Sequence, residues 1–419
     1  MPRVRPTARG WQAIFFGALT LFLARLFGTT QLYQLAYAIA GLFLVALVLS
    51  FVLSRGFEYT RRIPAGGRFV AGSPSYLELV VSNVSRTRSP GSEVVDHLPK
   101  RRLFEIPSVE GRKEQVYREP ALFTRRGLYE LGPAEIRTVD PFGLLRFVRR
   151  FETGEQIVVY PKVFDLLGFP LWGRGIQAGV QGALARREEE FADLREYHWG
   201  DDWRHIHWKS VARTGELIVK EFAQNTPQRH SVVLDLHRAG MGAPEAEIED
   251  AISTAGSVLK HLAHVGLPFR LLGMDKEHSA TSFGTGEAAY WRALALLATA
   301  RADGETKPET FLEEVLRGER GRLGDSVVLV LRSLDDDTVQ SVRSLRAAGL
   351  SVVVIALAAH TYRGGASASS SGCESTLSKY VQQLKRAGAT VHVVRRPGGV
   401  AVFAEGQWQG VAGTGGGTV

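Results

Sequence analysis

Two long apolar runs near the N-terminus constrain the fold of this chain more than any other feature. The first covers residues 11–27 and contains one charge, Arg25, while the second covers residues 32–53 and contains none. As helices that rise 1.5 Å per residue, they would be about 25 and about 33 Å long, which suits the roughly 30 Å hydrocarbon core of a bilayer. We therefore expect a transmembrane hairpin over residues 1–55, with helices at about 11–27 and 32–53.

Arginines flank the predicted hairpin on both sides: Arg3, Arg5 and Arg9 precede it, and Arg55, Arg61 and Arg62 follow it. The positive-inside rule then places both ends, and with them the main domains, in the cytoplasm. A cleaved signal peptide is the alternative for the first run, because its start is basic. The second run follows at once and no clear small-x-small cleavage site is present, so we favour a multi-pass protein of the cell membrane.

Residues 56–165 show the period-two alternation of half-buried β-strands. Strands are expected at 67–71, 76–83, 93–96, 115–118, 127–131, 134–139 and 156–160. Turn residues separate them, among them the run Asp140-Pro141-Phe142-Gly143. Short strands at regular spacing predict an antiparallel β-sandwich of immunoglobulin-like type, and we expect Phe142 to fill its core. Residues 166–190, Gly-rich and then charged, are interpreted as a linker.

Between residues 229 and 400, predicted strands and helices alternate. Strands are expected at 231–236, 269–272, 326–331, 351–357 and 390–394, and helices at 246–264, 287–299, 336–348 and 376–387. This alternation predicts an α/β domain, with helices on both faces of a parallel sheet. Residues 401–419 are interpreted as a tail.

Ligands of such sheets bind beside the carboxyl ends of the strands. In this sequence the loops at those ends are 237–245, 332–337 and 358–373. The second loop holds Asp335, Asp336 and Asp337. These acids either begin a helix, where they favour the positive end of its dipole, or meet a basic surface of a partner.

The segment 191–228 has the most unusual composition of the chain, because Trp199, Trp203 and Trp208 lie among histidines, arginines and acids. Tryptophan is usually well buried, and buried charges must be paired. We therefore expect Trp208 and Tyr197 to supply apolar contact area. Arginine forks are expected to pair with carboxylates: Arg195, Arg204 and Arg213 with Asp201, Asp202, Glu216 or Glu221. The segment is interpreted as a clip between the β and α/β domains. It could in addition present an exposed face that docks a partner, and the two roles are compatible.

The order Leu194-Arg195-Glu196-Tyr197, Gly200-Asp201-Asp202, Arg204-x-Ile206-x-Trp208-Lys209 and Ala212-Arg213-Thr214-Gly215 resembles the signature of a bacterial and archaeal membrane-protein family, domain of unknown function 58. Segments 126–133, 140–144 and 159–161 are similar to the same family. The positions assigned a structural or partner-binding role are Arg195, Tyr197, Gly200, Asp201, Asp202, Arg204, Ile206, Trp208, Lys209, Arg213, Gly215 and Glu221. The resemblance implies an architecture and a partner, a MoxR-type AAA+ ATPase, but no reaction.

The order of elements in the α/β domain, with an Asp closing its first strand, resembles a von Willebrand factor type A domain. That fold often binds magnesium through Asp-x-Ser-x-Ser, whose carboxylate and hydroxyls supply hard oxygen ligands. Here the stretch is Asp235-Leu236-His237-Arg238-Ala239, so both hydroxyls are missing and Arg238 adds a positive charge. We expect a degenerate site without a metal at Asp235, and no adhesion mechanism.

Few residues suggest catalysis or nucleic-acid binding. His198, His205 and His207 could form a zinc site, but tryptophans lie between them and the matching family positions do not require histidine. The single cysteine, Cys373, excludes an internal disulfide. The net charge of +8 comes from scattered arginines without a nucleic-acid-binding motif.

The sequence therefore predicts a membrane-anchored, non-enzymatic scaffold or adaptor without cofactor, metal or small-molecule substrate. The resemblance implies that it acts with the MoxR-type ATPase in assembly, chaperone-like or stress functions. The alternative is a membrane-tethered zinc-dependent hydrolase that uses the three histidines. A cell-surface adhesion module, a third class, would require the opposite topology and an intact metal site.

Overall fold

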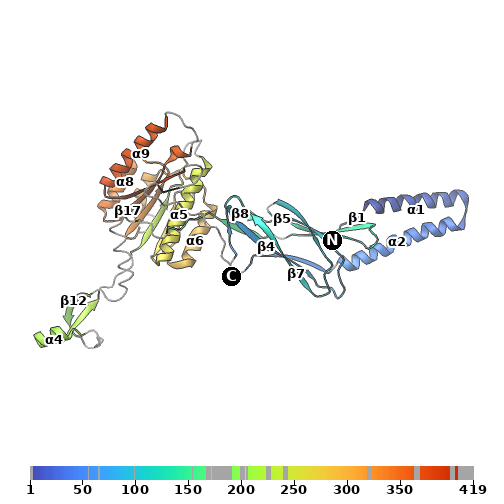
Figure 1. The fold of residues 1–419 in the computed structure, drawn as a ribbon, viewed down its shortest axis with the longest axis horizontal. Helices are drawn as coiled ribbons and strands as arrows, with labels where there is room; N and C mark the ends of the chain where they lie inside the picture. The colour runs from blue at the N-terminus through green and yellow to red at the C-terminus, as the bar shows by residue number, and fades with distance from the viewer. Residues whose placement is uncertain are drawn as a thin grey trace. The chain divides into compact units, whose positions relative to one another are not determined.

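The computed structural model describes residues 3–54, 56–64, 67–98, 100–152, 154–166, 171, 191–198, 203, 206–222, 228–238, 244–318, 323–362, 369–396 and 402–403. The chain divides into two compact units, Met1–Lys162 and Val163–Val419. Each unit has its own core, so each is described by itself (Figure 1).

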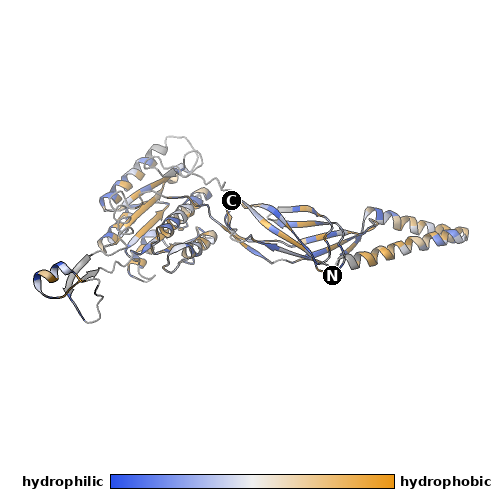
Figure 2. Cartoon of the chain, turned by 60° about the horizontal axis from the view of Figure 1, so that its bottom comes forward, coloured by the Kyte–Doolittle hydropathy of each residue, from blue (hydrophilic) through white to orange (hydrophobic). Residues whose placement is uncertain are grey.

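Unit 1 begins with a helical hairpin formed by α1 (Ala8–Phe27) and α2 (Thr30–Ser54). The Thr7 side chain caps α1 by accepting a hydrogen bond from the Gly10 N–H, and Gly28 ends the helix in the left-handed conformation (φ 67°). Both helices are coloured mostly hydrophobic in Figure 2. Large apolar side chains are exposed along both of them, for example Phe22 (64% exposed) and Leu44 (62%). Both helices are long and apolar enough to cross a membrane. The prediction of two apolar helices near the N-terminus is therefore confirmed.

The rest of unit 1 is rich in β-sheet. Its strands are β1 (Arg3–Pro6), β2 (Phe57–Arg62), β3 (Phe69–Val70), β4 (Pro74–Asn83), β5 (Ser92–Leu98), β6 (Lys100–Ile106), β7 (Glu114–Leu122), β8 (Gly127–Glu130), β9 (Ala134–Val139), β10 (Leu145–Phe151) and β11 (Gln156–Tyr160). They form sheets in the orders β1-β10-β9-β5-β6, β3-β11-β8 and β2-β4-β7. All the strands predicted between 67 and 160 are present. The strands β1, β2, β6 and β10 were not predicted, because repeated arginines in them interrupt the apolar alternation.

One core joins the three sheets of unit 1, with Phe57, Leu79, Val94, Ile136 and Ile157 among its buried residues. The expectation that Phe142 fills this core is wrong. Phe142 is 44% exposed, because it lies in the turn between β9 and β10. The carboxylate of Asp140 fixes that turn by accepting the N–H groups of Phe142 (2.8 Å) and Leu145.

The base of the helical hairpin is attached to this sheet region through β1. Residues Arg3 to Pro6 pair antiparallel with β10, in the register Arg3↔Val148 to Pro6↔Leu145. The N–H of Thr7 then donates to the Leu144 carbonyl at 2.9 Å. A side chain at Gly10 would collide with the same carbonyl, so the close approach of α1 requires glycine.

Apolar contacts complete this attachment. Leu144, Leu145 and Phe147 from β10 and its preceding turn are buried against Ala46 of α2. Ala13 of α1 and Phe43 of α2 pack against the same cluster. Both helices therefore contact the sheet region, in addition to the covalent link from α2 to β2.

Unit 2 contains a sheet in the order β15-β14-β16-β17-β18-β19. Its strands are β14 (His230–Leu234), β15 (Phe269–Gly273), β16 (Ser326–Leu331), β17 (Ser351–Leu357), β18 (Thr390–Arg395) and β19 (Val402–Phe403), and all pairings are parallel except that of β19. The helices are α5 (Glu245–Val265), α6 (Gly286–Thr299), α7 (Pro308–Leu316), α8 (Asp336–Ala347), the short η2 (Ala359–Thr361) and α9 (Ser369–Arg386). The predicted parallel sheet near the C-terminus is confirmed, and α7 was not predicted.

Helices cover both faces of this sheet (Figure 1). Phe311 of α7, Val342 of α8 and Leu384 of α9 are buried in one core with strand residues such as Val233 and Leu329. The helices α5 and α6 lie on the opposite side of the sheet, and residues of α5 such as Ile252, Leu259 and Leu262 are buried. The strands are apolar throughout because both of their faces are covered.

Candidate functional site

The carboxyl edge of the parallel sheet in unit 2 contains a topological switch point. After β14, the chain adds β15 on one side and then returns to add β16 on the other side of β14. The segments that leave the carboxyl ends of β14 and β16 therefore diverge, and in doubly wound sheets this is where a ligand crevice forms. Asp235 directly follows β14 and Arg332 directly follows β16.

Asp235 and Arg332 form a buried charged pair at this switch point. Asp235 is 2% exposed and Arg332 is 4% exposed. The Asp235 carboxylate accepts the N–H groups of His237 (3.0 Å) and Arg332 (3.1 Å). The Arg332 guanidinium donates from Nε to the Asp235 carbonyl (3.1 Å) and from Nη2 to the His237 carbonyl, and its Nη2 lies 3.9 Å from the carboxylate. The pairing offsets the cost of burying either charge alone, while the guanidinium nitrogen Nη1 of Arg332 is buried without a hydrogen-bond partner among the described residues.

The donor set around Asp235 does not fit a magnesium ion. A hard divalent cation requires several oxygen ligands, but the carboxylate here already accepts two backbone N–H groups and faces a guanidinium. The positive charge beside Asp235 comes from Arg332, which the sequence analysis did not single out. Arg238, named there as the repulsive charge, is exposed. The signal that could have identified Arg332 is its place directly after an apolar strand, equivalent to that of Asp235.

The loop after β14 is held by a close backbone approach. His237 forms an isolated parallel bridge with Gly304, and the Arg238 N–H donates to the Gly304 carbonyl at 2.7 Å. A side chain at Gly304 would collide with the Met274 carbonyl oxygen. The described part of this loop is therefore rigidly placed, while residues 239–243 of the predicted loop 237–245 lie outside the described residues.

The acids Asp335, Asp336 and Asp337 form the start of α8, as one of the two interpretations predicted. Asp335 is the N-cap, and its carboxylate accepts the N–H (2.7 Å) and the hydroxyl (2.6 Å) of Thr338. Asp336 and Asp337 lie in the first turn, and all three residues are exposed. Only Asp335 forms these capping contacts. The exposed carboxylates of Asp336 and Asp337 are therefore available to contact a partner.

A second polar cluster lies where β17 and β18 end. Arg396 donates to the Asp250 carboxylate (3.1 Å) and to the Ala246 carbonyl (3.2 Å). Burial raises the pKa of the Asp250 carboxyl, and Arg396 opposes this only in part. Glu374 of α9 joins the cluster edge by pairing with Arg395 and with His360 (2.8 Å). These contacts tie α5 and α9 to the end of β18, which is a structural role.

The family signature forms a small hairpin of β12 (Phe191–Glu196) and β13 (Ile218–Phe222), with α4 (Trp208–Thr214) between them. The strands pair antiparallel, with Arg195 opposite Val219 and Asp193 opposite Glu221. Ile206 (8% exposed) bridges to Val219 (3%). These two side chains form the apolar centre of the hairpin. Gly215 ends α4 in the left-handed conformation (φ 76°), which explains the glycine of the signature.

The expected burial of Trp208 is wrong. Trp208 is 63% exposed and Trp203 is 69% exposed, whereas Tyr197 is half-buried. Lys209 and Arg213 are exposed on α4, and among the described residues Arg213 forms no ion pair. The apolar surface of both tryptophans is therefore available for contact, which is the property of a docking face.

Several signature positions lie outside the described residues, namely Trp199, Gly200, Asp201, Asp202, Arg204 and His205. For Arg195 and Glu221 the backbone alone is described. The predicted ion pairs of Arg195 and Arg204 with Asp201, Asp202, Glu216 or Glu221 therefore stay predictions. The predicted clip between the β and α/β domains also stays a prediction.

The predicted histidine cluster is described at two of its three positions. The His198 ring nitrogen Nδ1 lies 3.1 Å from the Glu196 carbonyl, and His207 Nδ1 lies 2.7 Å from the Ser210 hydroxyl. Within the described part of the chain, no group of three or more histidines, cysteines or acids is placed to hold a metal ion. His205 lies outside that part.

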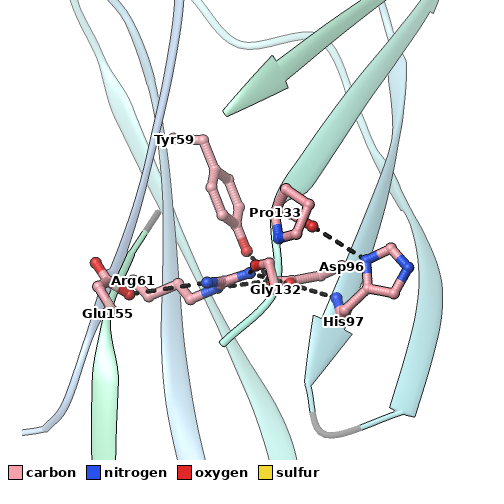
Figure 3. Close-up of polar contacts among 7 residues, drawn as sticks. All are labelled: Tyr59, Arg61, Asp96, His97, Gly132, Pro133 and Glu155. Atoms are coloured by element: carbon pink, nitrogen blue, oxygen red, sulfur yellow. Dashed lines mark hydrogen bonds and ion pairs between the residues drawn. The ribbon is translucent and has the colours of Figure 1, made fainter. Parts of the chain in front are cut away.

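A further buried charged network lies inside unit 1 and was not predicted (Figure 3). Arg61 of β2 pairs with Asp96 of β5, and both side chains are almost inaccessible (1% and 0% exposed). The Tyr59 hydroxyl also donates to Asp96, and Arg61 donates to the Gly132 carbonyl at 2.6 Å. The network links β2, β5 and the connection between β8 and β9, so it joins the three sheets.

Burial and the Asp96 carboxylate shift the pKa values of the groups around them. Burial and the Asp96 carboxylate together raise the pKa of the Tyr59 phenol, so it stays protonated. Burial alone would lower the pKa of Arg61, but its bonds to Asp96 outweigh that effect and raise it. Burial raises the pKa of Glu155, whose carboxylate lies 4.0 Å from Arg61. Tyr59, Arg61 and Asp96 thus use one another as hydrogen-bond partners, which is a structural role.

Comparison with known proteins agrees with the signature. Residues 193–361 match the model of the family described as "Protein of unknown function DUF58", which confirms the resemblance to that family. The chain is also 26% identical over 214 residues to the "Uncharacterized protein YeaD" of Bacillus subtilis, a match that covers 50% of this chain and 52% of that protein. The chain thus matches about half the length of this relative.

Two solved structures show distant likeness. One is the CARDB domain of a Pyrococcus furiosus protein in complex with di-metal ions, at 16% identity and a TM-score of 0.18, covering 25% of this chain and 90% of that chain. The other is Cwp6 from Clostridium difficile, at 10% identity and a TM-score of 0.16, covering 80% of this chain and 52% of that chain. Likenesses this distant define neither a fold nor a ligand for this protein.

Proposed function

We propose that this protein is a membrane-anchored scaffold or adaptor without a reaction of its own, acting with a MoxR-type AAA+ ATPase in assembly, chaperone-like or stress functions. The observation that carries the proposal is the attachment of the apolar hairpin to the sheet region through β1. A chain built this way holds its folded units at a membrane. The partner comes from the family resemblance.

The pairing of β1 supports a hairpin that crosses the membrane twice. β1 precedes α1 and β2 follows α2, yet both strands belong to unit 1. Both ends of the hairpin therefore lie on one side, and the flanking arginines make that side the cytoplasm. Cleavage of the first run as a signal peptide would remove β1 and the cap at Thr7, together with their bonds to residues 143–148.

The finer fold assignments belong to the same proposal. A shared core among the sheets of unit 1 favours an immunoglobulin-like sandwich. The strand order of unit 2, with Asp235 after its first strand, favours a von Willebrand factor type A-like domain. The Arg332 guanidinium beside Asp235 supports a version of that domain that takes no metal. An adhesion module would need that metal.

Two surfaces are suited to hold the ATPase: the acids Asp336 and Asp337 at the start of α8, and the exposed Trp203 and Trp208 of the signature hairpin. Carboxylates can pair with a basic patch, and exposed tryptophans are frequent anchors of protein interfaces. We place the first contact at Asp336 and Asp337, because the loops at the carboxyl edge of a parallel sheet commonly carry binding residues.

The test is co-purification from native membranes. The full chain, tagged at its C-terminus, should retain the MoxR-type ATPase after detergent extraction. The double variant Asp336→Lys/Asp337→Lys should lose it, while Asp335 remains to cap α8. The charge-matched control Glu58→Lys/Glu105→Lys changes two exposed acids of unit 1 and should retain the ATPase. If the wild-type chain retains no such ATPase, the partnership is wrong. Retention by the double variant would refute this docking surface alone.

A further inference from the structure

The outer face of β1 and β10 carries an unusual concentration of positive charge. Arg5 of β1 lies directly opposite Arg146 of β10, and Arg3 lies opposite Val148, so Arg3 shares their face. All three arginines are exposed. Like charges directly opposite each other destabilise a strand pair. The structure keeps them together at the junction with the hairpin.

These charges are not neutralised within the described residues. Arg137 and Arg150 lie on the same face, but each has a carboxylate partner, Glu135 at 3.0 Å and Glu152 at 2.8 Å. No carboxylate in the described ranges forms an ion pair with Arg3, Arg5 or Arg146. The face that these three residues form, the arginine surface, therefore needs an anion from outside the chain.

The arginine surface lies at the level where the apolar hairpin begins. Arg5 is two residues before Thr7, the cap of α1, and the exposed Trp11 follows in the first turns of that helix. Trp side chains prefer the boundary between headgroups and acyl chains. Arg146 is held at the same level, because its neighbours Leu145 and Phe147 pack against the hairpin cluster.

We propose that the arginine surface binds the phosphates of anionic phospholipid headgroups. The forked donors of a guanidinium match phosphate oxygens, and the attraction of a basic residue to an anionic membrane surface amounts to about fivefold in binding for each residue. The inference rests on the proposed membrane hairpin and adds the lipid class to it. The positive charge of the arginine surface thus comes from β1 and β10, which lie more than a hundred residues apart in sequence. Only folding brings these two strands together.

The test measures lipid retention by the full chain. The protein is purified in a neutral detergent and incubated with phosphatidylglycerol or with phosphatidylcholine, and the lipid that remains bound is quantified by mass spectrometry. The wild-type chain should retain phosphatidylglycerol preferentially. The variant Arg5→Gln/Arg146→Gln should lose this preference by about 25-fold, from about fivefold for each arginine. The control Arg301→Gln/Arg343→Gln removes two exposed arginines of unit 2 and should leave the preference unchanged.

Further measurements separate the outcomes. The thermal midpoint of Arg5→Gln/Arg146→Gln should be equal to or above that of the wild type, because opposed like charges are removed. An equal lipid preference in this variant and the wild type would overturn the inference. Displacement of the lipid by inorganic phosphate alone would also overturn it, since the surface would then be a site for free anions. Carbonate extraction of membranes tests the hairpin itself: release of the wild-type chain would refute the membrane anchor, whatever its lipid preference.

Discussion

Arg332 and Asp235, 97 positions apart in sequence, meet at the carboxyl ends of neighbouring strands, where the backbone N–H of Arg332 donates to the Asp235 carboxylate at 3.1 Å. The guanidinium of the same arginine lies 3.9 Å from that carboxylate. A cation built into the chain therefore stands beside the Asp235 carboxylate. Two predictions depend on this pair.

The substitution Arg332→Met should strongly destabilise the protein. It leaves the buried Asp235 carboxylate without its counter-charge, and breaking a buried pair from one side costs about 3–5 kcal/mol. The double variant Asp235→Asn/Arg332→Met should regain much of this loss, because no charge is then buried alone. Urea denaturation of the full chain in detergent compares the variants. Equal midpoints for Arg332→Met and the wild type would refute the structural role of the pair.

Asp235 should bind no magnesium at physiological concentration. The carboxylate already accepts two N–H groups and lies beside a guanidinium, so a divalent cation would meet repulsion and too few oxygen ligands. Isothermal titration of the full chain in detergent with magnesium should show no millimolar or tighter binding. A clear binding isotherm that disappears in Asp235→Ala would contradict the prediction.

Trp208→Ala should change the stability of the protein by less than about 0.5 kcal/mol, as expected for an exposed position. Its side chain is 63% exposed, so truncation removes little buried area. The matched variant Ile206→Ala should cost about 2–3 kcal/mol of local stability, because Ile206 packs on Val219 in the centre of the hairpin. Hydrogen exchange of the amides of β12 and β13 measures both effects. Fast exchange in Trp208→Ala, equal to that in Ile206→Ala, would show that the tryptophan is part of the core.

Stability should fall as the pH decreases from about 6.5 to 4, in part through His230. Burial lowers the pKa of His230 to about 4, although Asp325 opposes this shift. In this window the unfolded chain binds a proton at His230 and the folded chain does not, so acid favours unfolding, by up to about 3 kcal/mol. His230→Leu should flatten this part of the pH profile. Identical profiles for the wild type and His230→Leu would be inconsistent with a buried neutral imidazole.

A reporter protein fused to Val419 should lie in the cytoplasm. β1 and β2 place both ends of the hairpin in unit 1, and arginines flank both helices, so the main units are expected in the cytoplasm. A fluorescent reporter should be bright and an alkaline phosphatase fusion inactive. The reverse result would refute this topology. The arginine surface would then face the lipids of the opposite leaflet.

The parts of the fold that could be predicted are those in which one physical signal is strong along a continuous segment. The apolar run of β16 and the amphipathic pattern of α5 are examples, and both were placed within a few residues. β1 could not be predicted, because a segment of Arg3 to Pro6 has no periodicity of its own and its partner strand is far along the chain. Its strand character depends on tertiary contact alone.

The candidate site shows the same division. Asp235 could be found because an acid after a buried strand is conspicuous, and Arg332 stands in the same position after β16, but their pairing required the strand order that places β16 beside β14. Burial of Trp208 was expected from residue type, yet its side chain is 63% exposed. Composition thus located the unusual segment, while the direction of its side chains required the fold.

The pairing of β1 with β10 also has a mechanical consequence. A domain joined to a membrane helix by one peptide segment can swivel about that segment. Here the sheet region is held twice, once by the covalent passage from α2 to β2 and once by the strand that precedes α1. Two attachments restrict rotation more than one, so a torque applied to the sheet region would be transmitted to the helices.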